Sequence, residues 1–320
     1  MDTILKRLDD DFSVLLDAWP PEYCDRFALL KARIWPDSDI PAASRLPRFK
    51  ALTKLYPWLQ AQGLIPISDE QIAKALVAHV CLVAHAYASD KNIDGQLHFD
   101  ELDTHITTRF HDEAIRLLGE LRAQGAPAPG LRILFQGIGQ RPDNQGEGSN
   151  EARMIEAADV SARIGFLTTA CLLAYSGTPL DRLYLAASAY RHTVVALQYA
   201  DDVIDWREDL QLGDHNLLLG FMKDNGFNAY GLDASERSEL NVARALLRFR
   251  AIEVAACRAQ SHLHAAIQIQ DTLGCTMLAE KLALVIREIQ AMAPKQIRKL
   301  ENNVIIECLL SPVSLRMERL

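Results

Sequence analysis

Clusters of basic residues, closely spaced cysteines and long apolar runs are all missing from this sequence of 320 residues. Its 34 lysines and arginines are outnumbered by 42 aspartates and glutamates, which gives a net charge of −8. Nucleic-acid-binding surfaces need a clustered excess of basic residues, so we expect no nucleic-acid partner. An anionic ligand is still compatible with this charge, provided that a divalent metal ion supplies positive charge locally.

The six cysteines, at positions 24, 81, 171, 257, 275 and 308, lie far apart and form no C-x-x-C pair. This spacing favours free thiols in a reducing compartment, and we expect a cytoplasmic protein. The first residues, MDTILKRLDDDF, carry acids where a secretory signal has a basic region. Charged residues and histidines interrupt every long apolar stretch, so we expect no stable membrane insertion.

Apolar residues recur at helical spacing along most of the chain, and no segment alternates with the period of two that a half-buried strand requires. The expected helices are 22–34, 47–62, 69–91, 100–124, 150–176, 179–210, 233–273 and 276–300. Ser68 and Gln71 predict a capping box at the start of the helix 69–91.

The stretch 123–150 is rich in Gly and Pro and forms the longest expected loop. A domain boundary there is one interpretation. We favour a single domain over residues 1–320, because the helices on both sides of the loop are too apolar to form separate small bundles. The sequence therefore predicts an all-α fold, one large helical bundle around a central active-site cavity.

The segment LQYADDVIDWREDLQLGDHN, residues 197–216, contains five carboxylates within ten residues. On a helical wheel these acids and one amide share an arc of about 120°; they are Gln198, Asp201, Asp202, Asp205, Glu208 and Asp209. A solvated outer face is one interpretation. However, the preceding residues are apolar on every side, which is typical of a buried helix, and buried acids need a cation. We therefore favour a carboxylate set that binds Mg²⁺, an ion that prefers oxygen ligands.

The motif QYADDVIDWRED resembles the second aspartate-rich motif of the trans-isoprenoid synthase superfamily, which includes class I terpene synthases and prenyl diphosphate synthases. Prenyl elongases carry Q-x-x-D-D-x-x-D, which Gln198, Asp201, Asp202 and Asp205 match. Terpene cyclases carry ligands at i, i+4 and i+8, which correspond to Asp201, Asp205 and Asp209.

Two further patterns overlap the same segment. Phytoene synthases carry Q-x-x-N-x-x-x-D-x-x-E-D-x-x-x-G, which this chain matches through Glu208 and Gly213 among others, with Asp201 in the Asn position. The continuation EDLQLGDHN is similar to a tail found in large bacterial terpene synthases.

The superfamily places a partner motif on an earlier helix. Asp90 and Asp94 resemble the shortened D-x-x-x-D form of that motif in squalene synthases and large terpene synthases. Ser89 stands where the first Asp of the longer form would be. A polar helix end is the alternative interpretation of these residues.

The resemblance implies a site in which about three Mg²⁺ ions hold the diphosphate of a prenyl substrate. The implied metal ligands are Asp90, Asp94, Asp201, Asp205 and Asp209. The preferred diphosphate-binding, catalytic arginines are Arg153 and Arg163. The implied substrate-binding residues are Gln198, Asp202, Glu208, Arg191, Tyr87, Phe166 and Tyr199, to which Tyr190 is added as a cavity-lining residue. Arg191 has the alternative role of neutralising an acid, and each aromatic residue that of ordinary core.

The implied reaction is the ionisation of an allylic prenyl diphosphate, whose leaving group the metal ions and arginines stabilise. Prenyl elongases also carry a basic R-R-G after the first motif and a G-G-K-x-x-R near the N-terminus, and neither occurs here. The basic companions of squalene and phytoene synthases are not evident either. A class I terpene synthase, which cyclises or quenches the cation, is therefore the favoured function.

Other functions stay open. One alternative is a prenyl diphosphate synthase or a squalene- or phytoene-type condensing enzyme. Another is a non-catalytic accessory homologue, which Ser89 favours. A third is an unrelated metal-binding bundle, although the Glu-x-x-His pairs of di-iron bundles do not occur at an interior position. The sequence leaves open the prenyl chain length, the product, and whether the protein forms a homodimer.

Overall fold

The computed structural model describes residues 2–34, 56–61, 63–64, 68–93, 97–123, 152, 155, 166–213, 216–231 and 239–310. Within these ranges every regular element is a helix, which confirms the all-α prediction. The elements are α1 (Asp2–Asp17), α2 (Pro21–Ile34), α4 (Asp69–Ile93), α5 (Glu101–Ala123), α8 (Leu180–Leu212), α9 (Leu217–Asp224), the short 3₁₀ helix η1 (Ala229–Gly231), α10 (Glu239–Arg248), α11 (Ala251–Leu273) and α12 (Thr276–Leu310). Residues 56–61 and 166–175 are also helical.

These helices pack into two compact units. Unit 1 contains α1, α2, α4 and α5, together with residues 166–188 and 269–278. Unit 2 contains α9, η1 and α10, with residues 189–212 of α8, 251–268 of α11 and 279–310 of α12. The expectation of a single domain over the whole chain stays a prediction.

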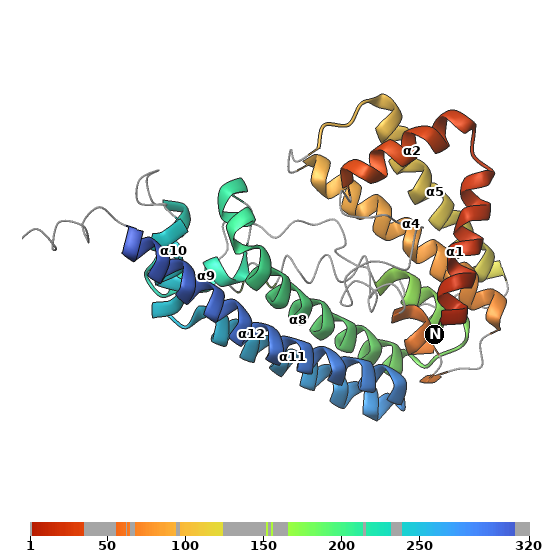
Figure 1. The fold of residues 1–320 in the computed structure, drawn as a ribbon. Helices are drawn as coiled ribbons and strands as arrows, with labels where there is room; N and C mark the ends of the chain where they lie inside the picture. Colours follow the sequence, from red (N-terminus) through yellow and green to blue (C-terminus); the bar gives the residue numbers. More distant parts are fainter. Residues whose placement is uncertain are drawn as a thin grey trace, which may run out of the picture. The chain divides into compact units, whose positions relative to one another are not determined.

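In unit 1, α4 packs along α5, while α1 packs on α4 and α2 on α5 (Figure 1). The guanidinium of Arg26 on α2 forms two hydrogen bonds with the fully buried carboxylate of Asp103 on α5, at 2.7 and 2.9 Å. The predicted capping box is confirmed at the start of α4. The backbone N–H of Gln71 donates to Ser68 Oγ at 3.3 Å, and that of Ser68 donates to Gln71 Oε1 at 3.2 Å.

A closed network of polar side chains also lies in unit 1. The amides of Gln60 and Gln270 bond each other in both directions, with N–O distances of 3.0 and 2.7 Å. Gln270 Nε2 also donates to the Tyr56 hydroxyl at 2.9 Å, and Gln60 Nε2 lies 3.2 Å from Cys275 Sγ. All four residues are buried, so each polar atom in this network depends on a protein partner.

In unit 2, α11 lies beside both α8 and α12 (Figure 1). The prediction of one continuous helix over 233–273 is wrong, because the chain turns between α10 and α11. Arg250 adopts a left-handed backbone conformation there, with φ of 51°. Apolar residues continue at helical spacing through the turn. Leu246 before the turn and Ile252 after it are both buried. Helices α1 and α9 were also not predicted.

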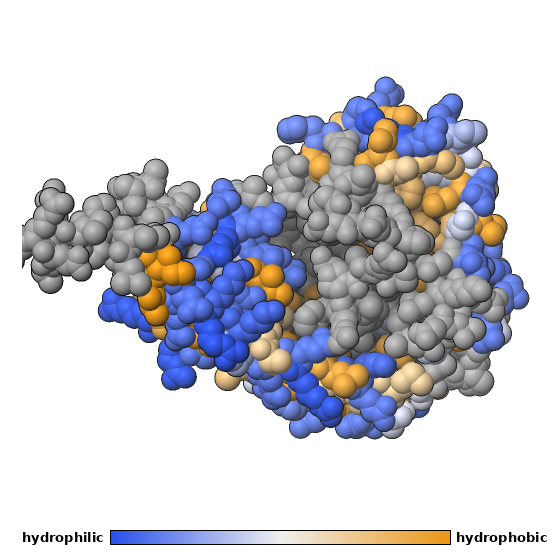
Figure 2. Space-filling view, in the orientation of Figure 1, coloured by the Kyte–Doolittle hydropathy of each residue, from blue (hydrophilic) through white to orange (hydrophobic). Residues whose placement is uncertain are grey.

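Hydrophilic residues cover most of the coloured surface in Figure 2, and apolar residues appear there in small separate groups. In the described part of the chain, no helix combines the length and apolar character needed to cross a membrane. Cys24, Cys81, Cys171, Cys257 and Cys275 are free thiols, as the cysteine spacing predicts.

Replacing Gln270 by Met keeps the volume of the side chain and removes its three hydrogen bonds with Gln60 and Tyr56. We expect the free energy of unfolding to fall by about 1–3 kcal/mol, because the buried amide of Gln60 loses its partners. Chemical denaturation measures this change. Gln268→Met, at an exposed position of the same helix, is the control and should stay within about 0.5 kcal/mol of the wild type. Equal effects of the two substitutions would contradict the role of the network.

Candidate functional site

The acidic residues in the last three turns of α8 differ in their exposure to solvent. Asp201 and Glu208 are exposed, Asp205 and Asp209 are half-buried, and Asp202 is buried with 3% of its surface exposed. The opposite face of the helix, formed by Val203, Trp206 and Leu210, is buried. The acidic arc therefore lies along the edge of the core, and one of its members enters the core.

The carboxylate of Asp202 is held by donors on both oxygens. Gln198 Nε2 donates to Oδ1 at 2.6 Å, and the backbone N–H of Leu217, the first residue of α9, donates to Oδ2. Burial, helped by the charges of Asp209 and Asp201, raises the pKa of Asp202 to about 7 against the opposing effect of these two hydrogen bonds. Asp202 thus joins the end of α8 to the start of α9.

Asn216 forms the second connection between the two helices. Its Nδ2 donates to the backbone carbonyl of Asp202 at 3.0 Å and to Asp209 Oδ2 at 2.6 Å. Its Oδ1 accepts from the backbone N–H of Leu219 at 3.1 Å, which makes Asn216 the N-cap of α9. Our sequence reasoning included this residue only as the last position of the EDLQLGDHN tail and assigned it no contact, although an Asn directly before the apolar run LLLGF is a helix-start signal.

The donor set at the end of α8 suits Mg²⁺ bound jointly with a phosphate-containing ligand. Asp201, Asp205 and Asp209 offer hard carboxylate oxygens on successive turns of one helix. Among the described residues, no group of three His, Cys, Asp or Glu side chains converges closely enough to enclose a metal ion. Mg²⁺ commonly takes only one or two carboxylates and completes its shell with water and substrate phosphates, and its binding at this helix end stays a prediction.

Several predicted site residues fall outside the described part of the chain. They are Asp94, Arg153, Arg163 and the side chains of Tyr87 and Asp90. Phe166 is buried in unit 1 and Tyr190 is buried in unit 2. Arg191 is exposed on α8. The structure thus brings together Gln198, Asp202 and Asp209 through the connection to α9, and the roles assigned to all of the site residues stay predictions.

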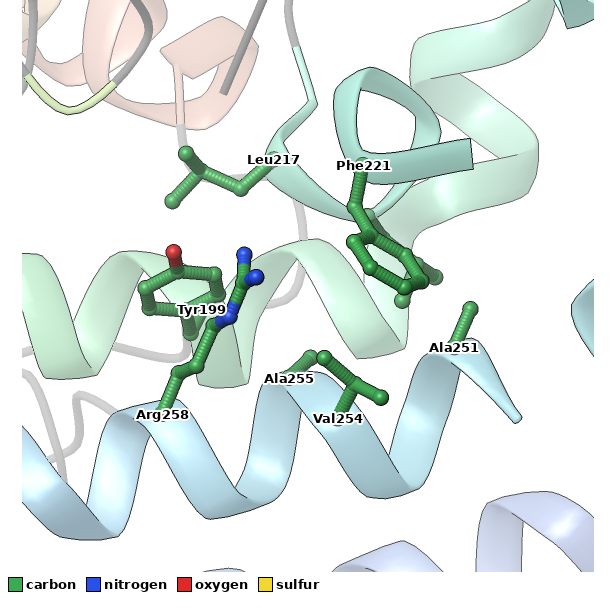
Figure 3. Close-up of a pocket in the computed structure, with 8 residues that line it drawn as sticks. Tyr199, Leu217, Phe221, Ala251, Val254, Ala255 and Arg258 are labelled. Carbon is green, nitrogen blue, oxygen red and sulfur yellow. The ribbon is translucent and has the colours of Figure 1, made fainter. Parts of the chain in front are cut away.

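Tyr199 lies on another face of α8 and lines a narrow pocket in unit 2 (Figure 3). Leu217 and Phe221 of α9 and Arg258 of α11 line it as well. The space between these atoms, open solvent included, is about 140 Å³ and leaves essentially no room for a water molecule, whereas ligand pockets usually enclose roughly 300–1,000 Å³. The pocket is therefore too small for a prenyl chain, and contact of Tyr199 with substrate stays a prediction.

Arg258 is a cation that our sequence reasoning did not single out. Its guanidinium carbon lies 5.1 Å from the ring centroid of Phe221, within the range of a cation–π interaction. In Figure 3 the guanidinium extends beside the ring of Tyr199. Burial lowers the pKa of Arg258 and raises that of Tyr199 to about 12. No local pattern in the sequence distinguishes Arg258 from the other arginines of the chain.

Two histidines join α8 to α11 next to Tyr199. The Nδ1 atoms of His192 and His262 are 2.8 Å apart, so one ring must donate its proton to the other. The Tyr199 ring stacks over His262 with a centroid distance of 6.3 Å. Burial and the charge of Arg191 lower the pKa of both histidines, and the neighbouring His192 adds to the effect on His262, whose pKa falls to about 4.

Comparisons with known proteins support the fold at the structural level. No protein-family model matches the chain, and no curated protein matches it in sequence. Among solved structures, the chain is similar to a geranylgeranyl pyrophosphate synthetase from the archaeon Geoglobus acetivorans, with a TM-score of 0.65 and 16% sequence identity. The match covers 89% of this chain and 98% of that one. The chain therefore has the all-α fold of an isoprenoid synthase, as the sequence predicts.

Acidification should destabilise the protein through His262. Its folded pKa of about 4 lies below the ordinary value of 6.5, so the unfolded state binds more protons between these pH values. The stabilisation is complete above pH 6.5 and is lost as the pH falls towards 4. We expect the drop in unfolding free energy between pH 7.5 and pH 5 to be smaller in His262→Gln than in the wild type.

The matched control for this measurement is His264→Gln, at an exposed position of the same helix. It should keep the pH dependence of the wild type. The same drop in all three proteins would show that the half-buried pair of His192 and His262 does not carry the effect.

Proposed function

We propose that the protein binds a prenyl diphosphate through Mg²⁺ at the acidic end of α8 and ionises or condenses it. The observation that carries this proposal is the set of carboxylates at Asp201, Asp205 and Asp209, at the edge of the core in a chain with an isoprenoid synthase fold. Fold alone does not define an activity, so the argument depends on the chemistry of this helix end.

The three carboxylates are assigned to hold Mg²⁺. When bound, the metal ions would supply the positive charge that stabilises a departing diphosphate. The protein's own contribution is to keep the ligands in place. Gln198 and Leu217 hold Asp202 in the core, so that the helix end cannot unwind without breaking buried hydrogen bonds.

Two reactions fit this site, and the structural neighbour favours one of them. The similar solved structure is described as a geranylgeranyl pyrophosphate synthetase, which supports a prenyl diphosphate synthase over the terpene synthase that the sequence favours. The Q-x-x-D-D-x-x-D pattern of Gln198, Asp201, Asp202 and Asp205 agrees with this assignment. We therefore propose condensation of an allylic diphosphate with a second prenyl unit as the first candidate.

A class I terpene synthase is the second candidate. Asp202 turns into the core, which leaves Asp201, Asp205 and Asp209 as the outward i, i+4, i+8 set that resembles the ligands of terpene cyclases. The missing R-R-G and G-G-K-x-x-R elements favour the same candidate, because a condensing enzyme must bind a second diphosphate.

The two candidates are separated by their co-substrate. The purified full chain is incubated with Mg²⁺ and geranyl, farnesyl or geranylgeranyl diphosphate, each with and without isopentenyl diphosphate. A longer prenyl diphosphate formed only with isopentenyl diphosphate identifies a synthase. A hydrocarbon or alcohol formed from one substrate identifies a terpene synthase. We expect EDTA to abolish turnover and Asp205→Asn to reduce it at least about tenfold.

Asp271→Asn, at an exposed position of α11, is the control substitution and should keep the wild-type rate. Failure to release diphosphate under any combination, together with failure to bind Mg²⁺ and inorganic pyrophosphate, would contradict the proposed function. Binding without any turnover would instead identify a non-catalytic homologue.

A further inference from the structure

Asn216 is completely buried, and its side-chain amide makes three hydrogen bonds at the junction of α8 and α9. The orientation of the amide follows from its partners. The backbone N–H of Leu219 can only donate, so Oδ1 must face it. Nδ2 then faces two acceptors, the carbonyl of Asp202 and Oδ2 of Asp209.

Capping of α9 explains only one of these three bonds. An N-cap needs an oxygen acceptor, and Ser, Thr, Asp and Asn all provide one. Of these four side chains, only Asn accepts from Leu219 while offering two N–H groups to α8. The bond to Asp209 is also charge-assisted and short, at 2.6 Å, which is the strong kind of protein hydrogen bond.

Asp209 needs such a partner because of its place in the helix. It lies three residues before the end of α8 at Leu212, where helices fray. Mg²⁺ demands near-ideal octahedral geometry, so a carboxylate that ligates it must be held in one direction. A hydrogen bond from a buried side chain provides that restraint, since Asn216 cannot move without losing its bonds to Leu219 and to the Asp202 carbonyl.

We propose that Asn216 is a positioning residue that orients the carboxylate of Asp209 for Mg²⁺ and a bound diphosphate. This inference rests on the function proposed above and adds to it a residue outside the acidic arc. Asp202 supports the arrangement, because its bond to the Leu217 N–H fixes the backbone next to Asn216. We therefore expect the affinity for Mg²⁺ to depend on the side-chain amide of Asn216, although this amide does not contact the metal ion.

Two substitutions separate positioning from capping. Asn216→Ser keeps an oxygen for the Leu219 N–H and loses the reach of the amide to Asp209, while Asn216→Ala loses both. Calorimetric titration of Mg²⁺ in the presence of inorganic pyrophosphate measures the affinity. If Asn216 positions Asp209, both variants should bind Mg²⁺ about 10–100-fold more weakly than the wild type. A role in capping alone predicts that Asn216→Ser binds as the wild type does.

The control substitution is Asn225→Ser at the other end of α9. Asn225 is exposed, and its Nδ2 donates to the Phe221 carbonyl at 2.8 Å. Asn225→Ser therefore also loses a side-chain hydrogen bond, but at the end of α9 away from Asp209. It should keep the wild-type affinity within about twofold, since it touches no carboxylate of the arc. Circular dichroism identifies which variants are folded.

A measurement on the unmutated protein decides the question if neither Asn216 variant folds. Nuclear magnetic resonance follows the side-chain amide signals of Asn216 and Asn225 while Mg²⁺ and pyrophosphate are added. We expect the Asn216 signal to shift with metal binding, because the metal withdraws charge from its acceptor, and the Asn225 signal to stay in place.

The failures of this inference and of the proposed function are distinguishable. Wild-type Mg²⁺ affinity in Asn216→Ser overturns the positioning role and leaves the proposed function intact. So does an Asn216 amide signal that does not shift in a protein that binds Mg²⁺. A wild-type protein that binds no Mg²⁺ with pyrophosphate overturns both.

Discussion

The concentration of five carboxylates at the C-terminal end of α8 is the constraint on which the surrounding structure depends. Like charges on adjacent turns repel each other, and the negative end of the helix dipole makes acids still less favourable there. No lysine or arginine takes a place within the arc, and Arg207 on the same turns is paired with Glu239 of α10. Hydrogen-bond donors from the following segment therefore have to offset part of this repulsion.

Those donors come from the start of α9. The first backbone N–H groups of a helix have no intrahelical acceptors and carry partial positive charge, so they suit a carboxylate. Asp202 uses the N–H of Leu217, and Asn216 adds an amide to Asp209. The positive end of α9 thus lies next to the negative end of α8, and the start of α9 becomes part of the acidic cluster.

Much of this architecture was predictable because it depends on local patterns. Helical periodicity and the Ser68–Gln71 box determine α4, and a helical wheel correctly places Asp205 and Asp209 on one side of α8. The wheel puts Asp202 at the margin of the arc, and only its partner on α9 decides that it turns inward. The break at Arg250 was missed because the apolar pattern continues across it, whereas the helical conformation of the backbone is interrupted there.

Contacts between distant residues set the limit of sequence reasoning. The pairing of Gln60 with Gln270 and that of His192 with His262 join positions far apart in the chain, and no spacing rule brings such residues together. Asn216 lies close to Asp209 in sequence, yet its role depends on a turn whose geometry the residue types alone do not specify.

If the acidic arc is the proposed diphosphate site, its charge makes the binding of metal and the binding of substrate depend on each other. A diphosphate is an anion, and the arc repels it for as long as the carboxylates are ionised and uncompensated. In the proposed site no three acidic side chains of the described residues converge on one point, so we expect Mg²⁺ alone to bind there with modest affinity. Bound Mg²⁺ would offset the negative charge that repels the diphosphate, and the diphosphate would complete the coordination shell of the metal. By linkage, each ligand then raises the affinity for the other by the same factor. If the proposed function holds, we expect the site to bind a diphosphate and its metal ions together and to bind either one poorly by itself.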